Sequence, residues 1–320
     1  MKKMQIGMTG IEVPAVAVGC MRLDGVDRKK GETLLRGALD MGLNFFDHAD
    51  FYGYWKNYVG ICEELFAEYL PMTPALREKI VIQTKCGVKI GPDGKGGMMN
   101  ISYDFSKDYI LRCVEDSLKR LKTDYIDGLL LHIPDALVEP EEVAEAFDLL
   151  EEQGKVRYFG VSNHTPMQIE LLKKYVKQPI CVNQQKLSLG YAPIISSGEY
   201  VCMPDERALS YDMESLNYGR LNSITMQCWS PFHGAKGGII LNEEKYPELN
   251  AVLEQMAEKY GTSKTAICIA WLLRHPAKLQ PVTGTMDIQH LKESADGMDI
   301  TLEHDDWYKL WIAAGNNTRA

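Results

Sequence analysis

The chain has 320 residues, of which 45% are hydrophobic and 25% charged, and this composition argues against a disordered, collagen-like or membrane-spanning chain. With 35 Lys and Arg against 44 Asp and Glu, the net charge is −9 and there is no basic block, so we expect no nucleic-acid partner. No apolar run approaches the ~20 residues of a spanning helix, and the stretch MQIGMTGIEV after Lys3 is not a signal-peptide core, so we expect a cytoplasmic protein with no membrane partner.

Two apolar patterns alternate along the chain and predict strands and helices in turn. In chain order, the first half contains a hairpin at 1–14 with Thr9-Gly10 at its turn, a strand at 15–20, a helix at 27–41, strands at 43–46 and 80–85, a helix after the N-cap Ser106, a strand at 128–133 and a helix that ends near Gly154. The second half contains a strand at 156–162, a helix from Thr165, a strand at 179–185, a helix around 205–220, a strand at 224–230, helices at 247–260 and 263–274, a strand at 280–284, and helices at 287–296 and 302–313.

Eight short apolar strands that alternate with amphipathic helices imply a parallel sheet covered by helices, either a closed barrel or an open doubly wound sheet. The chain has the size of a (β/α)8 barrel, no linker rich in Pro, Gly and Ser, and no G-x-G-x-x-G after an early strand. We therefore predict an α/β fold, a TIM barrel built as a single domain from residues 1–320, with an N-terminal hairpin and an extra C-terminal helix. Trp307 and Trp311, four apart on that helix, are expected to pack rather than to bind a ligand.

Cysteine and histidine usage indicates neither disulfides nor a metal site. The eight cysteines form no C-x-x-C pair, and we expect most of them to be buried thiols in a reducing compartment: Cys20, Cys62, Cys86, Cys113, Cys181, Cys202, Cys228 and Cys268. Cys86, beside Lys85, is the only cysteine whose neighbourhood suggests a nucleophile, and we favour a packed thiol for it. The seven histidines offer no H-E-x-x-H and no Cys/His ligand spacing, so we expect no metal, and we interpret His48 and His164 as solvated or structural.

Three loops longer than usual follow strands, at 86–106, 185–204 and 231–246, which puts them on the C-terminal rim where barrel active sites are built. The glycine-rich stretch 91–97 lacks the P-loop pattern and is expected to be a mobile rim loop. The stretch 232–238, which contains Lys236, either closes over a pyrophosphate through backbone N–H groups and one charge or is an ordinary flexible loop.

Polar residues gather at the C-terminal ends of the otherwise apolar strands. They are Asp47, Lys85, His132, Ser162, Asn163, Gln184 and Ser230. In a barrel these positions converge on one cavity although they are dispersed in sequence. Tyr52 follows Asp47 by five residues, so a phenol is expected above a carboxylate at the barrel mouth.

This set of residues predicts an acid–base site that needs no metal. A free phenol has a pKa of about 10 and is a poor proton donor to a developing alkoxide near neutrality. A lysine ammonium beside the phenol lowers its pKa, and a carboxylate keeps that ammonium charged and in place. Lys85 and Asp47 are the candidates for these roles toward Tyr52, and His132 is the candidate that orients a carbonyl oxygen.

Seven segments, taken in order, resemble the aldo-keto reductases over nearly the whole chain: NFFDHADFYG, IVIQTK, GLLLHIPD, YFGVSNH, VNQQ, CWSPF and QPVTGT. The pairing of RHPAKLQPVTGT with FDHADFYG resembles the bacterial members in particular. The resemblance implies a catalytic tetrad of Asp47, Tyr52, Lys85 and His132, with Tyr52 as general acid. It implies hydride transfer from a reduced nicotinamide to the carbonyl carbon of a small aldehyde or ketone, and His132 in place of Glu favours this reaction over carbon–carbon double-bond reduction.

The resemblance also implies how a dinucleotide would be held. Its nicotinamide carboxamide would contact Ser162, Asn163 and Gln184, and Trp229 stands where many relatives stack a Tyr on the ring. Further candidate contacts are Ser230 and Lys236.

At the adenosine end, NADPH-selective relatives hold the 2′-phosphate with a basic residue after the last strand and an Arg a few positions later. Here those places fall on Gly284 and His290, with Thr285 as a further hydroxyl and Lys292 nearby. NADP(H) is the expected cofactor and NAD(H) the alternative.

The alternative function is a nicotinamide-binding sensor or partner subunit with little turnover, and a barrel isomerase or lyase is a third. The intact tetrad favours the reductase, because binding alone would not require Tyr52 and Lys85 together.

Overall fold

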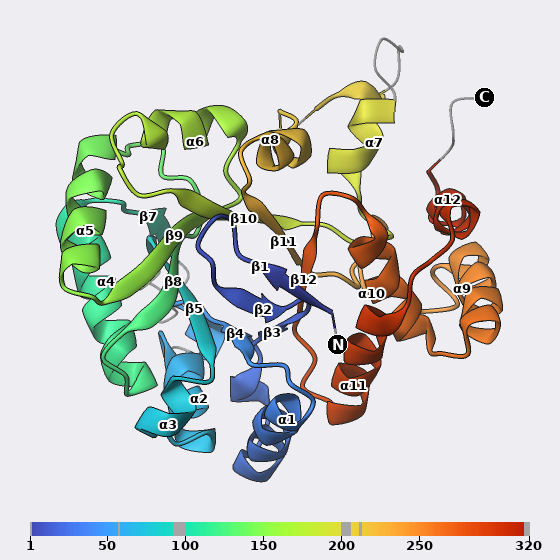
Figure 1. Ribbon diagram of the computed structural model, residues 1–320, viewed down its shortest axis with the longest axis horizontal. Helices are drawn as coiled ribbons and strands as arrows, with labels where there is room; N and C mark the ends of the chain where they lie inside the picture. Colours follow the sequence, from blue (N-terminus) through green and yellow to red (C-terminus); the bar gives the residue numbers. More distant parts are fainter. Residues whose placement is uncertain (1, 57, 92–99, 200–205, 211–212, 317–320) are drawn as a thin grey trace.

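The computed structural model describes residues 2–56, 58–91, 100–199, 206–210 and 213–316, and eight parallel strands close into a barrel among them (Figure 1). These strands are β3 (Ala17–Gly19), β4 (Phe45–Asp47), β5 (Val81–Cys86), β8 (Ile126–Leu131), β9 (Val156–Ser162), β10 (Ile180–Lys186), β11 (Thr225–Trp229) and β12 (Gln280–Thr283). Each pairs with the next along the chain, and β12 pairs with β3 to close the circle. The predicted barrel is confirmed.

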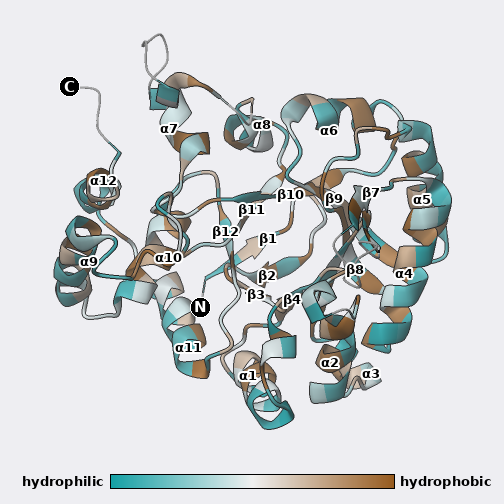
Figure 2. Ribbon diagram, turned by 180° about the vertical axis from the view of Figure 1, so that it is seen from behind, coloured by the Kyte–Doolittle hydropathy of each residue, from teal (hydrophilic) through white to brown (hydrophobic). Residues whose placement is uncertain are grey.

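Helices cover the outside of the barrel (Figure 1). They are α1 (Arg28–Asp40), α2 (Ile61–Tyr69), α3 (Pro74–Arg77), α4 (Lys107–Leu121), α5 (Pro140–Glu152), α6 (Pro166–Lys173), α7 (Pro193–Glu199), α8 (Ser215–Leu221), α9 (Pro247–Tyr260), α10 (Lys264–Arg274), α11 (Ile288–Asp296) and α12 (His304–Ala313). Their apolar faces pack on the strands, and hydrophilic residues colour much of the outer helical surface in Figure 2. Thr165 begins α6 with the predicted cap, and Gln168 completes a capping box with it.

The predicted N-terminal hairpin pairs β1 (Lys3–Gln5) with β2 (Glu12–Pro14) and lies across one end of the barrel (Figure 1). Ile6 and Val13 from this hairpin are fully buried with Phe45 and Leu130 from the barrel interior. The hairpin therefore closes the N-terminal end, and a ligand reaches the barrel interior from the opposite end, where the strands finish.

The extra C-terminal helix is fixed by stacked tryptophans. Trp271 of α10 lies 4.8 Å from Trp307 and 6.0 Å from Trp311 of α12 between ring centroids, with near-parallel planes. Each of Trp271 and Trp307 donates its indole N–H to the other's backbone carbonyl. The pair on α12 packs, as the sequence predicts.

Several parts of the chain differ from the sequence prediction, among them the short helices α3 and α7, which were not predicted. The helix expected around 205–220 is shorter, because α8 begins only at Ser215. α2 was not predicted, since the buried Glu63 interrupts its apolar face. The loop 86–106 contains an unpredicted rim hairpin of β6 (Val88–Gly91) and β7 (Asn100–Tyr103), whose second strand is exposed along its length and has no apolar alternation.

Throughout the residues that the structure describes, every helix is too short or too polar to cross a membrane.

Candidate active site

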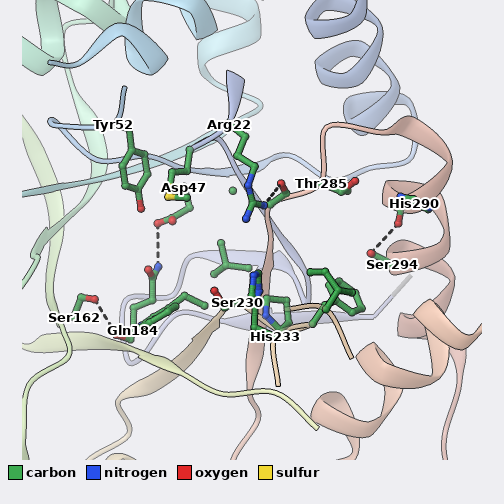
Figure 3. Close-up of a pocket in the computed structure, with 18 of the residues that line it drawn as sticks. Arg22, Asp47, Tyr52, Ser162, Gln184, Ser230, His233, Thr285, His290 and Ser294 are labelled. Atoms are coloured by element: carbon green, nitrogen blue, oxygen red, sulfur yellow. Dashed lines mark hydrogen bonds between the residues drawn. The ribbon is translucent and has the colours of Figure 1, made fainter. Parts of the chain in front are cut away.

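A cavity of about 540 Å³ opens at the C-terminal ends of the barrel strands (Figure 3). Of the residues that the sequence places in the site, ten line this cavity: Asp47, Tyr52, His132, Ser162, Asn163, Gln184, Trp229, Ser230, Thr285 and His290. Lys85 is fully buried and touches the Tyr52 hydroxyl from behind. The barrel thus brings together side chains that are far apart in sequence.

Tyr52 reaches the cavity through a tight turn after β4. The Asp50 N–H donates to the Lys85 carbonyl at 3.0 Å, which ties this turn to the end of β5. Gly53 follows with φ of +101°, and a Cβ there would lie 2.0 Å from the Ile61 side chain, so the turn requires glycine. These constraints fix the Tyr52 ring above the strand that carries Lys85.

The Lys85 ammonium is the centre of the polar group beneath the cavity. Its Nζ donates to Asp47 Oδ2 at 2.7 Å, to the His48 carbonyl at 2.6 Å and to the Tyr52 hydroxyl at 3.2 Å. All three donor positions of the ammonium are therefore used. Asp47, which is 2% exposed, forms a buried ion pair with this lysine.

Burial and charge act against each other in this group. Burial alone would lower the pKa of Lys85, but the Asp47 carboxylate and the Tyr52 phenol outweigh it and raise that pKa above its usual value. Burial raises the pKa of the Tyr52 phenol, and the Lys85 ammonium offsets only part of the rise. The direction of the lysine effect agrees with the sequence argument, but the net shift of Tyr52 is upward because the ring is buried. The phenol therefore holds its proton at neutral pH.

His132 stands beside Tyr52 at the end of β8. Its ring centroid lies 6.0 Å from that of Tyr52 and 5.0 Å from that of Phe51. Burial, together with the Lys85 ammonium, holds the pKa of His132 well below its usual value, so the imidazole is neutral. Its Nδ1 is buried without a hydrogen-bond partner. A neutral imidazole offers one N–H donor, which suits the orientation of a carbonyl oxygen.

On the other side of the cavity, three predicted residues form a connected cluster. Asn163 donates from Nδ2 to Ser162 Oγ at 2.9 Å and to the His132 carbonyl at 3.2 Å, and its Oδ1 accepts from Trp229 Nε1 at 3.0 Å. Asn163 and Ser230 both have left-handed backbone, with φ of +61° and +55°. Such strained positions collect at functional sites because a packed scaffold holds them.

Gln184 joins this cluster to Asp47. Its backbone carbonyl accepts from Ser162 Oγ at 2.9 Å, and its side-chain amide donates to Asp47 Oδ1 at 3.1 Å (Figure 3). The amide nitrogen also donates to Gln227 at 2.9 Å. The amide nitrogen is thus turned into the barrel interior while the residue lines the cavity.

Between Asp47 and Thr285, the cavity contains a cation that the sequence analysis missed. Arg22, in the loop after β3, is exposed, lines the cavity and donates from Nη1 to the Gly284 carbonyl at 2.9 Å (Figure 3). Thr285, just before α11, and His290, in its first turn, lie farther from Tyr52 than Arg22 does in Figure 3. Arg22 lies outside the seven matching segments, and its partner is far away in sequence, so no local signal pointed to it.

Other predicted features lie outside the cavity lining. The Lys236 ammonium lies 5.8 Å from the Tyr246 ring centroid, and the residue is not among those that line the cavity. The glycine-rich stretch 91–97 falls almost entirely outside the described residues. Burial raises the pKa of the Cys86 thiol well above its usual value, which fits a packed thiol.

His48 and His164 are buried and structural. His48 packs edge-on against Phe66 at 4.6 Å, and neither of its ring nitrogens has a partner. His164 Nδ1 hydrogen-bonds the Ser162 carbonyl at 2.8 Å, and its ring stacks on Phe105. Over the described ranges, no three or more His, Cys, Asp and Glu side chains are grouped so that they could hold a metal ion.

Comparisons with known proteins show which family the chain resembles in sequence and in fold. The sequence model of the Aldo/keto reductase family matches residues 15–312. The uncharacterized oxidoreductase YcsN of Bacillus subtilis is 34% identical over 287 residues, which cover 88% of this chain and 87% of that protein. The 6-dehydroglucose reductase of Agrobacterium fabrum is 31% identical over 308 residues, 95% of each protein. The solved structure of the thermostable aldo-keto reductase Tm1743 with the inhibitor epalrestat has a TM-score of 0.75 at 25% identity and covers 98% of this chain and 100% of that one.

Proposed function

The chain belongs to the aldo/keto reductase family, and from that premise we propose that it is an NADP(H)-dependent reductase that converts a small aldehyde or ketone to an alcohol. The observation that carries the proposal is the contact of 3.2 Å between Lys85 Nζ and the Tyr52 hydroxyl, with Asp47 paired behind the lysine at 2.7 Å. A protonated phenol backed by a buried ammonium is suited to give its proton to an alkoxide and to remain stable as phenolate.

In the proposed reaction, a reduced nicotinamide, when bound, supplies the hydride. His132 donates an N–H to the substrate carbonyl oxygen and orients the carbonyl carbon. Tyr52 transfers its hydroxyl proton to the same oxygen as negative charge develops there. The Lys85 ammonium, held by Asp47, stabilises the phenolate that remains until the proton is replaced from solvent.

The polar groups of the cavity suit a dinucleotide. Ser162, Asn163 and Gln184 line one end of the cavity, where the carboxamide would be held, and Trp229 supplies an aromatic face beside them. At the same end, His132 Nδ1 is buried and has no hydrogen-bond partner. Beside Gly284, Arg22 offers a charge for the phosphates.

Arg22 also bears on the choice between NADP(H) and NAD(H). Gly284 and His290 leave this chain without the basic pair of NADPH-selective relatives, and Arg22 places a guanidinium directly against Gly284. We assign phosphate binding to Arg22, with Thr285 and His290 beside it, and NADP(H) as the preferred cofactor. Arg22→Met should weaken NADPH binding more than NADH binding in fluorescence titrations. An equal loss of affinity for both nucleotides would refute a contact between Arg22 and the 2′-phosphate.

The substrate is proposed as a small carbonyl compound. Beside Tyr52 and His132 the cavity wall is apolar, formed by Met21, Phe51 and Ile133. The relative from Agrobacterium fabrum is a 6-dehydroglucose reductase, so a sugar aldehyde should be assayed next to an aromatic one. We also propose the cytoplasm as the location, since the seven cysteines that the structure describes are free and buried.

The test is the consumption of NADPH and of NADH by the purified protein with a reactive aromatic aldehyde. Tyr52→Phe should lose most turnover and keep its nucleotide affinity. Tyr54→Phe is the matched control, because it removes the same hydroxyl two residues away, where no catalytic role is proposed. Equal turnover of Tyr52→Phe and the wild type would refute the mechanism. Binding of both nucleotides without consumption of either would favour the sensor instead.

A further inference from the structure

Four glutamine side chains form a continuous amide column inside the barrel, below Asp47. The amide column consists of Gln83 on β5, Gln184 on β10, Gln227 on β11 and Gln280 on β12. Three of them are 0% exposed and Gln184 is 2% exposed. Interiors of such barrels are usually filled by branched apolar side chains, and burying an amide is costly unless its hydrogen bonds are made. This column therefore needs an explanation beyond packing.

The hydrogen bonds of the column run from one end of the barrel to the other. Gln280 Nε2 donates to the Pro14 carbonyl of the N-terminal hairpin at 3.0 Å, and Gln227 Nε2 donates to Gln280 Oε1 at 2.9 Å. Gln83 Nε2 donates to Gln227 Oε1 at 2.8 Å and to Asp47 Oδ1 at 2.6 Å. No side-chain atom of the four glutamines is among the buried polar atoms left without a partner in the described chain.

Both ends of the column accept hydrogen bonds and cannot donate them. The Pro14 carbonyl and a paired Asp47 carboxylate are acceptors only, so Gln280 and Gln83 must turn their NH₂ groups toward them. Gln227 then has one arrangement left: its oxygen accepts from the NH₂ groups of Gln83 and Gln184, and its own NH₂ donates to the oxygens of Gln280 and, at 3.3 Å, of Gln83. The two ends fix the direction of every amide between them, and Gln83 cannot flip without breaking contacts.

Tyr158 of β9 holds Gln83 from the side. Its hydroxyl donates to Gln83 Oε1 at 3.1 Å, and Tyr158 is 3% exposed. Its ring fits because Gly128 on the neighbouring strand has no Cβ, since one there would lie 2.3 Å from the Tyr158 ring. The position of Gln83 is therefore set by Tyr158, Gln227 and Asp47 together.

We propose that Gln83 is a positioning residue for the reaction: its amide holds Asp47 in the orientation that pairs it with Lys85, and so sets the charge environment of the Tyr52 hydroxyl. This inference rests on the proposed function. Asp47 gives Oδ2 to Lys85 and Oδ1 to the neutral donors Gln83 and Gln184. Neutral donors share the carboxylate charge without competing with the ammonium, as a second cation would.

Few titratable groups among the described residues face Tyr52. They are Asp47 from β4, Lys85 from β5, His132 after β8 and Cys62 from α2. Cys20 and Tyr158 also interact with Asp47, and burial raises the pKa of both far above neutrality, so neither is charged there. Near and above neutral pH, the charges that act on the phenol are therefore those of Lys85 and Asp47, and Gln83 touches one of them.

The test compares Gln83→Met with Gln280→Met. Both remove one buried amide from the same column, but Gln280 is separated from Asp47 by two other amides. In Gln83→Met, the Asp47 carboxylate loses a hydrogen-bond donor, so its negative charge disfavours the Tyr52 phenolate more strongly. We therefore expect kcat to fall about 10- to 100-fold, as for the loss of one hydrogen bond to a charged group. The KM for NADPH should not change. The alkaline limb of the kcat profile should move to higher pH. Gln280→Met should keep the wild-type kcat and limb.

A second readout does not need turnover. Tyrosinate absorbance is titrated with pH in the wild type and in Gln83→Met, and the Tyr52 contribution is taken as the difference from the same protein carrying Tyr52→Phe. A shift to higher pH in Gln83→Met supports the positioning role even if no carbonyl compound is reduced, a result that would refute the proposed function alone. An unchanged titration and limb in Gln83→Met, or the same change in Gln280→Met, would overturn the inference.

Discussion

Replacing Lys85 by Met tests the centre of the site. Met has a similar length but no charge, so the change removes the hydrogen bonds of Nζ to Asp47, to the His48 carbonyl and to Tyr52 at 2.7, 2.6 and 3.2 Å. Two losses follow. Tyr52 loses the cation that stabilises its phenolate, and Asp47 becomes a buried carboxylate without an ionic partner.

The structure allows both effects to be sized. An opposite charge within 4–6 Å typically changes a pKa by about 1–3 units, so the phenol of the variant should be a weaker acid by that amount and kcat should fall about 10- to 1,000-fold. Removal of one partner from a buried ion pair costs about 3–5 kcal/mol of folding free energy. Nucleotide affinity should stay nearly constant, because Lys85 does not line the cavity.

The assay combines steady-state kinetics against pH, nucleotide titration and urea unfolding. Lys89→Met is the control, since that lysine forms only a half-exposed pair with Asp104 on the rim. The double variant Asp47→Asn/Lys85→Met should recover stability relative to Lys85→Met without recovering turnover, because it removes the second charge as well. Wild-type kcat and alkaline limb in Lys85→Met would refute the reasoning, and a double variant less stable than Lys85→Met would refute the buried-charge explanation.

Three further predictions concern stability. Burial and the Lys85 ammonium lower the pKa of His48 to about 3, so folding stability should be lost as pH falls below the unfolded-state pKa of about 6.5. In urea unfolding at successive pH values, His48→Leu should make this loss smaller. An unchanged dependence of stability on pH would contradict the prediction. Burial and Glu63 raise the pKa of Asp50 to about 7, so folding stability should fall as pH rises from about 4 to 7. Thermal unfolding of Asp50→Asn should not show this fall. An equally steep fall in the variant would count against the role of Asp50. Trp311→Ala should cost about 3–5 kcal/mol by calorimetry or denaturant unfolding while kcat stays unchanged, and a cost below about 1 kcal/mol would show that the stack is not tightly packed.

The barrel was predictable because its signals are local. Apolar runs such as IVIQTK and the Thr165 cap each determine one element, and eight alternations leave few topologies. α2 could not be found in this way, because Glu63 on its buried face pairs with Arg120 and Thr84, which are distant in sequence. Nor could the rim hairpin, whose strand 100–103 is exposed at every position.

The site was predictable where strand ends supply it and unpredictable where pairing between distant segments does. Asp47 and His132 reach the cavity from the ends of their strands, and Tyr52 reaches it from the turn that follows β4. Arg22 reaches it by contact with Gly284 across the barrel seam, and no property of its own neighbourhood requires that contact. The net upward shift of the Tyr52 pKa also needed the structure, because burial is its largest cause and burial is not visible in the sequence.

The five tryptophans lie in different environments, so they should give separate fluorescence and circular dichroism signals. Trp271, Trp307 and Trp311 stack with near-parallel rings 4.8–6.0 Å apart, so their excited states couple and should dominate the near-ultraviolet circular dichroism. Trp229 lines the cavity, so a bound ring should quench its emission, while Trp55 is 43% exposed and should emit at the longer wavelengths of a solvated indole. Loosening of the C-terminal helix and filling of the cavity can therefore be followed independently in a single unlabelled sample.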